Sequence, residues 1–370
     1  MYKIAWLPGD GVGNEVMEAA RLVLDALKLD AEYIPGDIGW EFWKTEGNPL
    51  PDRTIDLCNN TDCALFGAIT SKPRDEAIEE LAPELRDKGF AYSSPIVALR
   101  QTFDLHTNLR PCKAFPGNPL NFKEGIDLAV FRENTEGLYA GVEFNPVSVE
   151  MKKFIDSKHK KFHRFVDVPD EELAISMRIF TRNGCERIVR AAFEYAKKTN
   201  RPSVTVVEKP NVIRETSGMM IRVAREVARE FPGIELWETN IDAMCMWLVK
   251  NPGDYSVLVA SNMFGDIISD LAAQLVGGLG FASSANMGDK YAVFEPTHGS
   301  APKYYGQYKV NPMAMLLTTR LMLEWLGEKE MAGKLEKSIS KTIADEKIRT
   351  YDMGGSNTTL EIAEEVVRNL

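Results

Sequence analysis

The chain has 370 residues, 44% hydrophobic and 26% charged, with a formal net charge of −10 at pH 7. This length predicts two lobes, and the composition predicts a soluble globular protein. The acidic balance argues against a nucleic-acid partner, and no apolar run reaches the length of a membrane span. Five cysteines without C-x-x-C spacing predict neither a disulfide framework nor a zinc site. We therefore expect a cytoplasmic protein.

Apolar runs alternate with amphipathic helical periods along the chain. A predicted strand at 4–7 leads through a glycine-rich loop into a helix with an apolar face of Val16, Ala20, Val23 and Leu27. Further buried parallel strands are predicted at 63–66, 128–131, 203–207 and 256–260. Residues 74–89 are helix-rich, with a break at Pro83. This alternation is typical of an α/β fold.

Two other stretches depart from the alternation. Residues 144–168 carry little helical period and contain a basic run from Lys152 to Arg164. We interpret this stretch as a solvated arm that leaves the core and takes part in dimer contacts, in preference to a binding patch. Residues 294–304 are rich in proline and glycine, which predicts a loop, and this loop contains His298.

Asp266 and Asp270 lie four residues apart, so on a helix both carboxylates leave the same face. Two like charges this close repel each other unless a cation lies between them, and carboxylate oxygens suit Mg²⁺ or Mn²⁺. A solvated acidic turn is the common alternative. Apolar neighbours predict a mostly buried helix, in which unpaired carboxylates would be costly: Met263, Phe264, Ile267, Ile268 and Leu271. A metal site is therefore expected here.

Arg100, Arg110 and Arg132 come at or just beyond strand-like or helix-like segments. Three guanidinium groups match a substrate with two or more carboxylates, although each arginine alone could form a surface ion pair. Lys209, after the 203–207 strand, is a candidate base, and Tyr139 is a candidate proton donor. The loop Pro8–Gly13 approaches a dinucleotide-binding motif, but its third glycine comes one residue early.

These motifs together resemble the isocitrate/isopropylmalate family of metal-dependent β-decarboxylating dehydrogenases. The resemblance covers nearly the whole chain and is carried, in order, by Pro8–Gly13, Leu109-Arg110-Pro111, Arg132–Gly137, Asn262–Asp270 and His298–Pro302. It implies an isopropylmalate dehydrogenase-like fold of two α/β lobes with a central cleft. The large, cofactor-side lobe would comprise 1–105 and 277–370. The small lobe would comprise 106–276, with the dimer interface and an arm near 144–168.

The resemblance also implies roles for the candidate residues. Arg100, Arg110 and Arg132 would hold the carboxylates of a hydroxy di- or tricarboxylic acid. Asp266 and Asp270, with Asp242 from a second subunit, would bind Mg²⁺ or Mn²⁺. Lys209 from the second subunit would help to deprotonate the hydroxyl group, and Tyr139 would return a proton after CO₂ leaves. A homodimer with shared active sites follows.

The resemblance gives mixed signals on the cofactor. NAD-using members usually carry Asp where this chain has Lys303, so NADP is expected and NAD remains possible. Gly355 stands where NADP enzymes carry a further Arg, which weakens the site for the 2′-phosphate. The residues implied in nucleotide binding are Thr70, Asn211, Glu295, His298, Gly299, Ser300, Ala301, Lys303, Tyr304, Val310, Asn311 and Tyr351.

The substrate signal is also mixed. Ser94, six residues before Arg100, fits the isocitrate enzymes, whereas Ile96 and Val97 fit the apolar pocket of isopropylmalate enzymes. An apolar wall cannot replace a hydrogen bond to a carboxylate. Because the C-terminal half resembles NADP-type isocitrate dehydrogenases, isocitrate comes first, with isopropylmalate and homoisocitrate as alternatives. A non-catalytic regulatory subunit is less expected, since Lys209, Tyr139 and the metal aspartates are all present.

Overall fold

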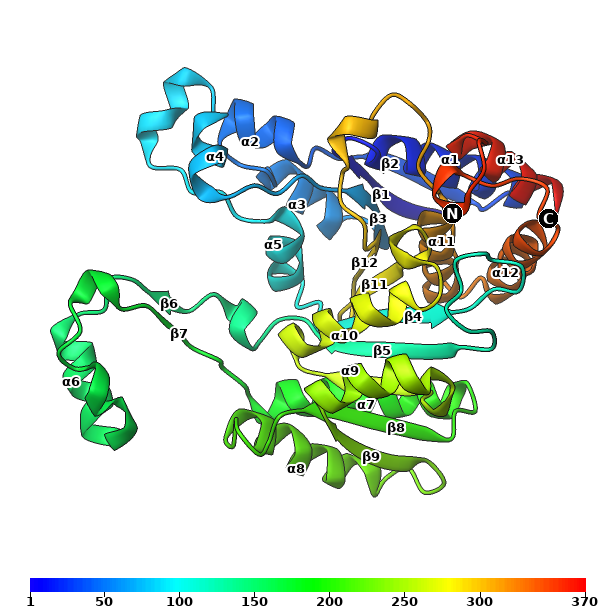
Figure 1. Ribbon diagram of the computed structural model, residues 1–370. Helices are drawn as coiled ribbons and strands as arrows, with labels where there is room; N and C mark the ends of the chain where they lie inside the picture. Colours follow the sequence, from blue (N-terminus) through cyan, green and yellow to red (C-terminus); the bar gives the residue numbers. More distant parts are fainter.

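The computed structural model describes all 370 residues and has the expected α/β fold, built on one ten-stranded sheet (Figure 1). A separate two-stranded ribbon projects from its body. The strands are β1 (Tyr2–Gly9), β2 (Ala31–Pro35), β3 (Cys63–Ala68), β4 (Thr107–Lys113), β5 (Asp127–Glu133), β6 (Glu143–Phe144), β7 (Ile175–Ser176), β8 (Ser203–Glu208), β9 (Glu235–Asn240), β10 (Val257–Ala260), β11 (Ser283–Met287) and β12 (Ala292–Pro296).

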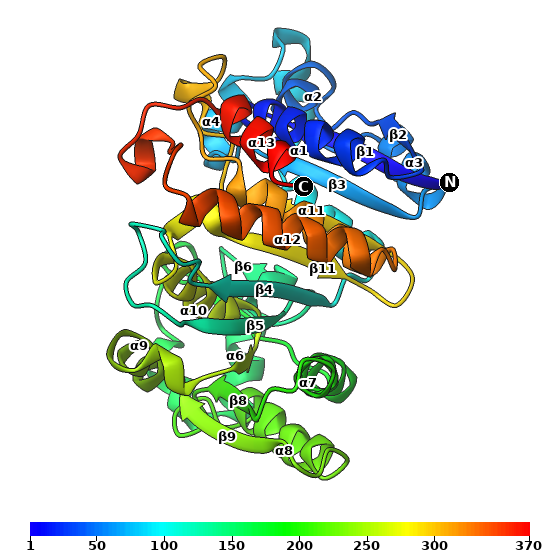
Figure 2. The same cartoon turned by 90° about the vertical axis from the view of Figure 1, so that its right-hand side faces the viewer.

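Helices connect most of these strands and pack along the sheet (Figures 1 and 2). They are α1 (Gly13–Leu27), α2 (Trp40–Glu46), α3 (Asp52–Asn59), α4 (Arg74–Glu79), α5 (Pro95–Thr102), α6 (Val149–Lys158), α7 (Arg182–Lys198), α8 (Thr216–Ala228), α9 (Ile241–Lys250), α10 (Asn262–Gln274), α11 (Met313–Trp325), α12 (Lys329–Ala344) and α13 (Thr359–Arg368). No helix is both long enough and apolar enough to cross a membrane.

The main sheet consists of two parallel halves joined by antiparallel strands. Its order is β2-β1-β3-β12-β11-β4-β5-β10-β8-β9. The first four strands are mutually parallel, as are the last four, whereas β11 and β4 run antiparallel to their neighbours. The boundaries 1–105 plus 277–370 and 106–276 stay a prediction, because the sheet continues through both halves.

Local sequence explains most of the helices and strands of the main sheet. The predicted strands at 63–66, 128–131, 203–207 and 256–260 all form, and their residues are buried. Val16, Ala20 and Val23 of α1 are fully buried as expected. The predicted break at Pro83 is confirmed, since α4 ends at Glu79 and a 3-10 turn begins at Pro83. The prediction of a loop from residue 294 was wrong at its start, because Phe294–Pro296 complete β12.

Residues 144–168 contain the helix α6, although their sequence carries little helical period. The ribbon β6–β7 carries α6 away from the body of the molecule (Figure 1). The Ser148 hydroxyl caps α6 by accepting a hydrogen bond from the Met151 amide at 3.3 Å. Because only Lys152 of this helix is buried, its sequence shows no apolar stripe. The Lys152 ammonium contacts Asp170 at 2.6 Å, so this member of the basic run is not solvated.

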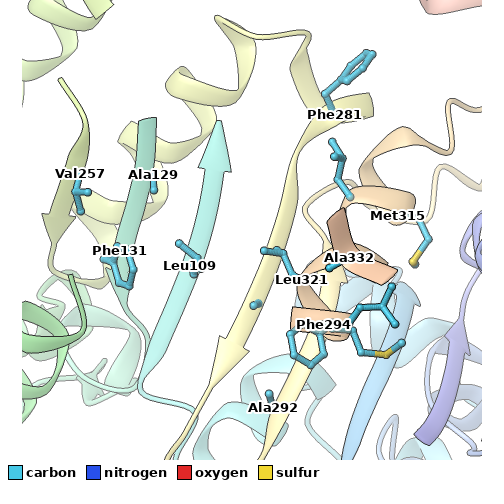
Figure 3. Close-up of a cluster of buried hydrophobic side chains, with 14 of the residues drawn as sticks. Leu109, Ala129, Phe131, Val257, Phe281, Ala292, Phe294, Met315, Leu321 and Ala332 are labelled. Atoms are coloured by element: carbon cyan, nitrogen blue, oxygen red, sulfur yellow. The ribbon is translucent and has the colours of Figure 1, made fainter. Parts of the chain in front are cut away.

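A single hydrophobic cluster fills the space along one face of the sheet. Leu109 and Phe131 from the central strands belong to the same cluster as Phe294 of β12 and Leu321 of α11 (Figure 3). The cluster therefore crosses from one half of the sheet to the other. Its continuity fixes the central strands β4, β5, β11 and β12. These strands also carry the polar side chains of Arg110, Arg132, Asn286 and Glu295.

Candidate active site

Helix α10 presents the two aspartates on one face, as its sequence predicts. It begins directly after β10, and its buried side is formed by Phe264, Ile268 and Ala272. The expectation of a mostly buried helix was wrong in part, since Ile267 is 50% exposed. The side chains of Asp266 and Asp270 are 31% and 61% exposed. The two carboxylates therefore lie at the mouth of a site, where a ligand can reach them.

Two buried arginines from adjacent strands converge on these aspartates. On β4, Arg110 donates from Nη1 to Oδ1 of Asp270 at 3.0 Å, and the same nitrogen lies 3.3 Å from Oδ1 of Asp266. On β5, Arg132 donates from Nη1 to Oδ1 of Asp266 at 2.5 Å. Nη1 of Arg110 thus lies between one oxygen of Asp266 and one oxygen of Asp270. The two aspartates can therefore share a cation. This geometry fits the carboxylate donors that a hard divalent ion prefers.

Tyr139 completes this group. Its hydroxyl donates to Oδ2 of Asp266 at 3.0 Å, and the Arg132 guanidinium lies 5.3 Å from its ring centroid. Burial and the Asp266 carboxylate raise the pKa of Tyr139, so the phenol remains protonated at neutral pH. Burial and the guanidinium groups of Arg110 and Arg100 lower the pKa of Arg132 to about 9. Crowded cations of this kind favour the binding of an anion.

Asn262, at the start of α10, holds Arg132 in place although the sequence suggested no role for it. Its Oδ1 accepts from Nε of Arg132 at 3.0 Å and from Nη2 at 2.8 Å. A polar residue at the first position of a helix that carries two candidate ligands is the signal that could have identified it.

Arg100 lies on α5, and its partners differ from those of the other two arginines. It donates to Oδ1 of Asn286 and to Oε1 of Glu295, both at 2.9 Å. Glu295, implied by the resemblance as a cofactor residue, therefore contacts Arg100 in a buried position; its cofactor role stays a prediction. Ser94 is the N-cap residue of α5, and its side chain makes no capping hydrogen bond. Ile96 is 8% exposed and packs in a hydrophobic cluster with residues such as Leu7 and Leu99.

The residues assigned to a second subunit form their own group. Lys209, directly after β8, forms an ion pair with Asp242 near the start of α9, and this contact lowers the pKa of Asp242. Asn211 is exposed in the turn after Lys209. No cluster of three acidic, histidine or cysteine side chains that could hold a metal ion exists within the chain. Asp242 therefore does not join Asp266 and Asp270 within one chain.

A cavity of about 430 Å³ collects most of the predicted nucleotide residues. Its lining includes His298, Gly299, Ala301, Tyr304, Val310, Asn311 and Tyr351, whose role in nucleotide binding stays a prediction. It also includes residues that sequence reasoning missed: Val12, Leu120, Gln274, Gly277–Gly280 and Asp352. The glycine-rich run at 277–280 was the available signal, since glycines permit close approach of a ligand to the backbone.

The polar atoms of this cavity suit a nucleotide. His298 contacts the Gly299 carbonyl through Nδ1 at 3.0 Å, while its Nε2 is buried without a partner. Burial lowers the pKa of His298, so its ring is neutral. The carboxylate of Asp352 accepts from Nδ2 of Asn311 at 3.1 Å. A free ring nitrogen, an amide and a carboxylate along this cavity can form hydrogen bonds with a base and a ribose.

Three further nucleotide candidates, Thr70, Ser300 and Lys303, do not line the cavity. Thr70 and Ser300 share a hydroxyl contact of 2.7 Å next to the Pro8–Gly13 loop. Gly11 of that loop has a φ of +52°, and a Cβ there would lie 2.3 Å from the Ser300 carbonyl oxygen. The loop thus packs tightly against residues 298–301. Lys303 is outside the lining, with Nζ 4.9 Å from the ring centroid of Tyr304.

Comparisons with known proteins identify the family of the chain. The family model for isocitrate/isopropylmalate dehydrogenase matches residues 3–366. The chain belongs to this family. It is 42% identical to the 3-isopropylmalate dehydrogenase of Archaeoglobus fulgidus, over 99% of this chain and 98% of that protein. Its fold matches the crystal structure of isocitrate dehydrogenase from Methylococcus capsulatus with a TM-score of 0.87 and 35% identity, covering 100% and 99% of the two chains.

Family membership makes the chain a decarboxylating hydroxy-acid dehydrogenase in general terms. It is also 40% identical to protein DlpA of Legionella pneumophila over 99% of its own length, but it spans only 58% of that longer protein. The family therefore defines the fold and the reaction type, whereas the substrate and cofactor must be argued from the site.

Proposed function

We propose that this enzyme oxidises a 2-hydroxy di- or tricarboxylic acid and removes one carboxylate as CO₂, using a divalent cation and NADP. The observation that carries the proposal is the convergence of Arg110 and Arg132 on Asp266 and Asp270 beside Tyr139. Guanidinium groups grip carboxylates in two places, and paired aspartates suit Mg²⁺ or Mn²⁺. A site with both can hold an anionic substrate against a cation.

The side chains of this chain have distinct tasks in that reaction. Arg100, Arg110 and Arg132 bind and orient the carboxylates. Lys209, supplied by a second copy of the chain together with Asp242, accepts the hydroxyl proton as hydride leaves C2. Tyr139 returns a proton to the carbon that loses CO₂, which its raised pKa allows at neutral pH. A divalent cation held by Asp266 and Asp270 supplies Lewis-acid polarisation of the substrate oxygens, and a nicotinamide supplies the hydride acceptor.

Isocitrate is the first substrate that we propose. The Ser94 hydroxyl makes no capping hydrogen bond in α5, so it is free to donate to a third carboxylate. Of the two residues that fit isopropylmalate, Ile96 packs in the core beside Leu99, whereas Val97 is only partly buried. 3-Isopropylmalate is the second candidate, because the 3-isopropylmalate dehydrogenase of Archaeoglobus fulgidus is 42% identical to this chain. Homoisocitrate is a further alternative with the same carboxylate pattern as isocitrate.

NADP is the cofactor that we propose, and Lys303 supports it as a cation beside the nucleotide cavity. The absence of an arginine at Gly355 has a steric reason, since a Cβ there would lie 2.0 Å from the Arg349 carbonyl oxygen. NAD is the second candidate, because the Asp352 carboxylate lines the cavity and can accept hydrogen bonds from a ribose diol.

A homodimer is proposed because Lys209 and Asp242 lie apart from the aspartates of α10 in the same chain. The arm supports this assembly, since Val149 is 44% exposed and Phe154 is 65% exposed on α6. Apolar side chains on a projecting ribbon and helix are typical of a surface that a partner covers. A non-catalytic regulatory subunit is disfavoured, because Tyr139, Lys209 and all three aspartates are retained.

The decisive experiment is absorbance at 340 nm with purified protein, Mn²⁺, NADP⁺ or NAD⁺, and isocitrate, 3-isopropylmalate or homoisocitrate in turn. We expect reduction of NADP⁺ with isocitrate that stops when EDTA removes the metal. Activity with 3-isopropylmalate alone would overturn the substrate assignment. No metal-dependent reduction with any of the three acids would overturn the proposed function.

A further inference from the structure

Asn286, on β11, lies at the centre of a buried polar network that the sequence did not reveal. Its side chain is fully buried, with 0% of the residue exposed. Its Oδ1 accepts three hydrogen bonds of 2.9 Å each, from Nε of Arg100 and from Nδ2 of Asn108 and of Asn134. Its Nδ2 donates to Oε1 of Glu295 at 2.8 Å. Every polar atom of this carboxamide is engaged.

The network reaches two of the three candidate substrate arginines. Arg100 contacts Asn286 directly, and Glu295 binds a second nitrogen of the same guanidinium at 2.9 Å. Arg110 is reached through Asn108, whose Oδ1 accepts from Nε of Arg110 at 2.7 Å. In both arginines these contacts use Nε, which fixes the plane of the guanidinium. Nη1 of Arg100 and Nη2 of Arg110 make no hydrogen bond within the chain.

We infer that Asn286 is a positioning residue that orients Arg100 and Arg110 for the carboxylates of the substrate. The inference rests on the proposed function and extends it to a residue that touches no ligand. A guanidinium with its Nε fixed presents its remaining N–H groups in one direction, so less rotational freedom is lost when an anion binds. The network also joins α5, β4, β11, β12 and the turn after β5, so both arginines share one rigid support.

Mutation can exchange the amide of Asn286 and the carboxylate of Glu295 between the two positions, and this exchange tests whether the hydrogen bond between them is required. In Asn286→Asp the donor to Glu295 is lost and two carboxylates face each other at the position of the 2.8 Å contact. In the double variant Asn286→Asp/Glu295→Gln the donor returns from the opposite side, and the net charge of the pair is unchanged. Asn286→Leu removes every hydrogen bond of the Asn286 side chain and leaves the contacts of Arg100 with Glu295 and of Arg110 with Asn108. Ser338→Ala, which removes a buried hydrogen bond to the Val366 carbonyl far from the site, controls for loss of stability alone.

Two measurements follow for each variant: steady-state KM for the acid and for NADP⁺, and calorimetric binding of tricarballylate, a tricarboxylate with no hydroxyl group to oxidise. We expect Asn286→Leu and Asn286→Asp to raise the acid KM and the tricarballylate Kd by about 10-fold or more, while the NADP⁺ KM changes less than about two-fold. The double variant should recover most of the loss in tricarballylate affinity, and Ser338→Ala should leave the acid KM and the tricarballylate Kd unchanged.

Unchanged acid KM in Asn286→Leu, or equal changes for acid and NADP⁺, would overturn the inference. If Asn286→Leu does not fold, the comparison of Asn286→Asp with the double variant tests the inference. A double variant that binds tricarballylate no more tightly than Asn286→Asp would also overturn it. A wild-type protein that binds tricarballylate but oxidises no hydroxy acid would overturn the proposed function alone, and the tricarballylate constants of the variants would still decide the role of Asn286.

Discussion

The Nζ atom of Lys209 is hydrogen-bonded to Oδ1 of Asp242, and this pair does not join Asp266 and Asp270 in the same chain. The two halves of the proposed chemistry are thus separated along one polypeptide. A second copy of the chain can bring them together, because a symmetric dimer presents each group to the other subunit.

Mixed dimers test this separation directly. Lys209→Met and Asp266→Asn should each be inactive alone, but refolding them together should restore about a quarter of wild-type activity, because half of the dimers then contain one intact site. Mixing Lys209→Met with Asp242→Asn is the matched control, since both changes affect the same contributed group and no intact site can form. Equal recovery in the two mixtures, or none in the first, would contradict the shared site.

Arg132→Lys should lower kcat/KM for the acid by about 100-fold, because misplaced binding groups cost roughly this much in rate. Lysine retains the charge but has one nitrogen in place of the three with which Arg132 binds Asn262 and Asp266. Steady-state kinetics with Mn²⁺ provide the measurement. Arg225→Lys, at an exposed ion pair with Glu238, should leave the kinetics unchanged.

Lys303→Asp should reduce kcat/KM for NADP⁺ by about 10-fold or more and for NAD⁺ much less, because a carboxylate repels the 2′-phosphate that the ammonium attracts. Both constants come from the same assay at 340 nm. Lys329→Asp, at the start of α12, serves as a charge-matched control. Equal reductions in kcat/KM for NADP⁺ and NAD⁺ would refute the role assigned to Lys303.

Tyr139→Phe should lower kcat by about 100- to 10,000-fold with a small effect on KM, as expected for the loss of a general acid. The pKa of Tyr139 is raised by burial and by the negative charge of Asp266, so the phenol keeps its proton up to a higher pH than a free tyrosine. Ultraviolet difference titration of wild type against Tyr139→Phe should therefore show this tyrosine ionising only above pH 10. Ionisation at or below pH 10 would show that Asp266 does not stabilise the protonated form.

Arg178→Met should destabilise the protein by about 3–5 kcal/mol, because it leaves a buried carboxylate without its counter-ion. Glu208 is fully buried, and its Oε2 accepts from Nη2 of Arg178 at 2.9 Å. Urea unfolding measures the change. Adding Glu208→Gln to Arg178→Met should recover part of the loss, whereas Arg182→Met at an exposed pair with Glu226 should change little.

Much of this fold could be predicted from the sequence because its signals are local. The apolar runs that form β3, β5, β8 and β10 are continuous because both faces of a parallel strand are buried. The four-residue spacing of Asp266 and Asp270 likewise fixes their common face on α10. Helix α6 was missed for the opposite reason, since an arm helix with little buried surface carries no apolar stripe.

The site depended on contacts between residues far apart in the chain. The sequence by itself determined the family, the α/β class and the types of side chain on which the proposed site is built. Only the tertiary structure decided that Asn286 supports Arg100 from a position 186 residues away, that Glu295 is the buried partner of Arg100, and that Gly277–Gly280 and Asp352 line the cavity next to His298. Hydrogen bonds between distant strands follow from sheet order and register, and no local pattern encodes either of these.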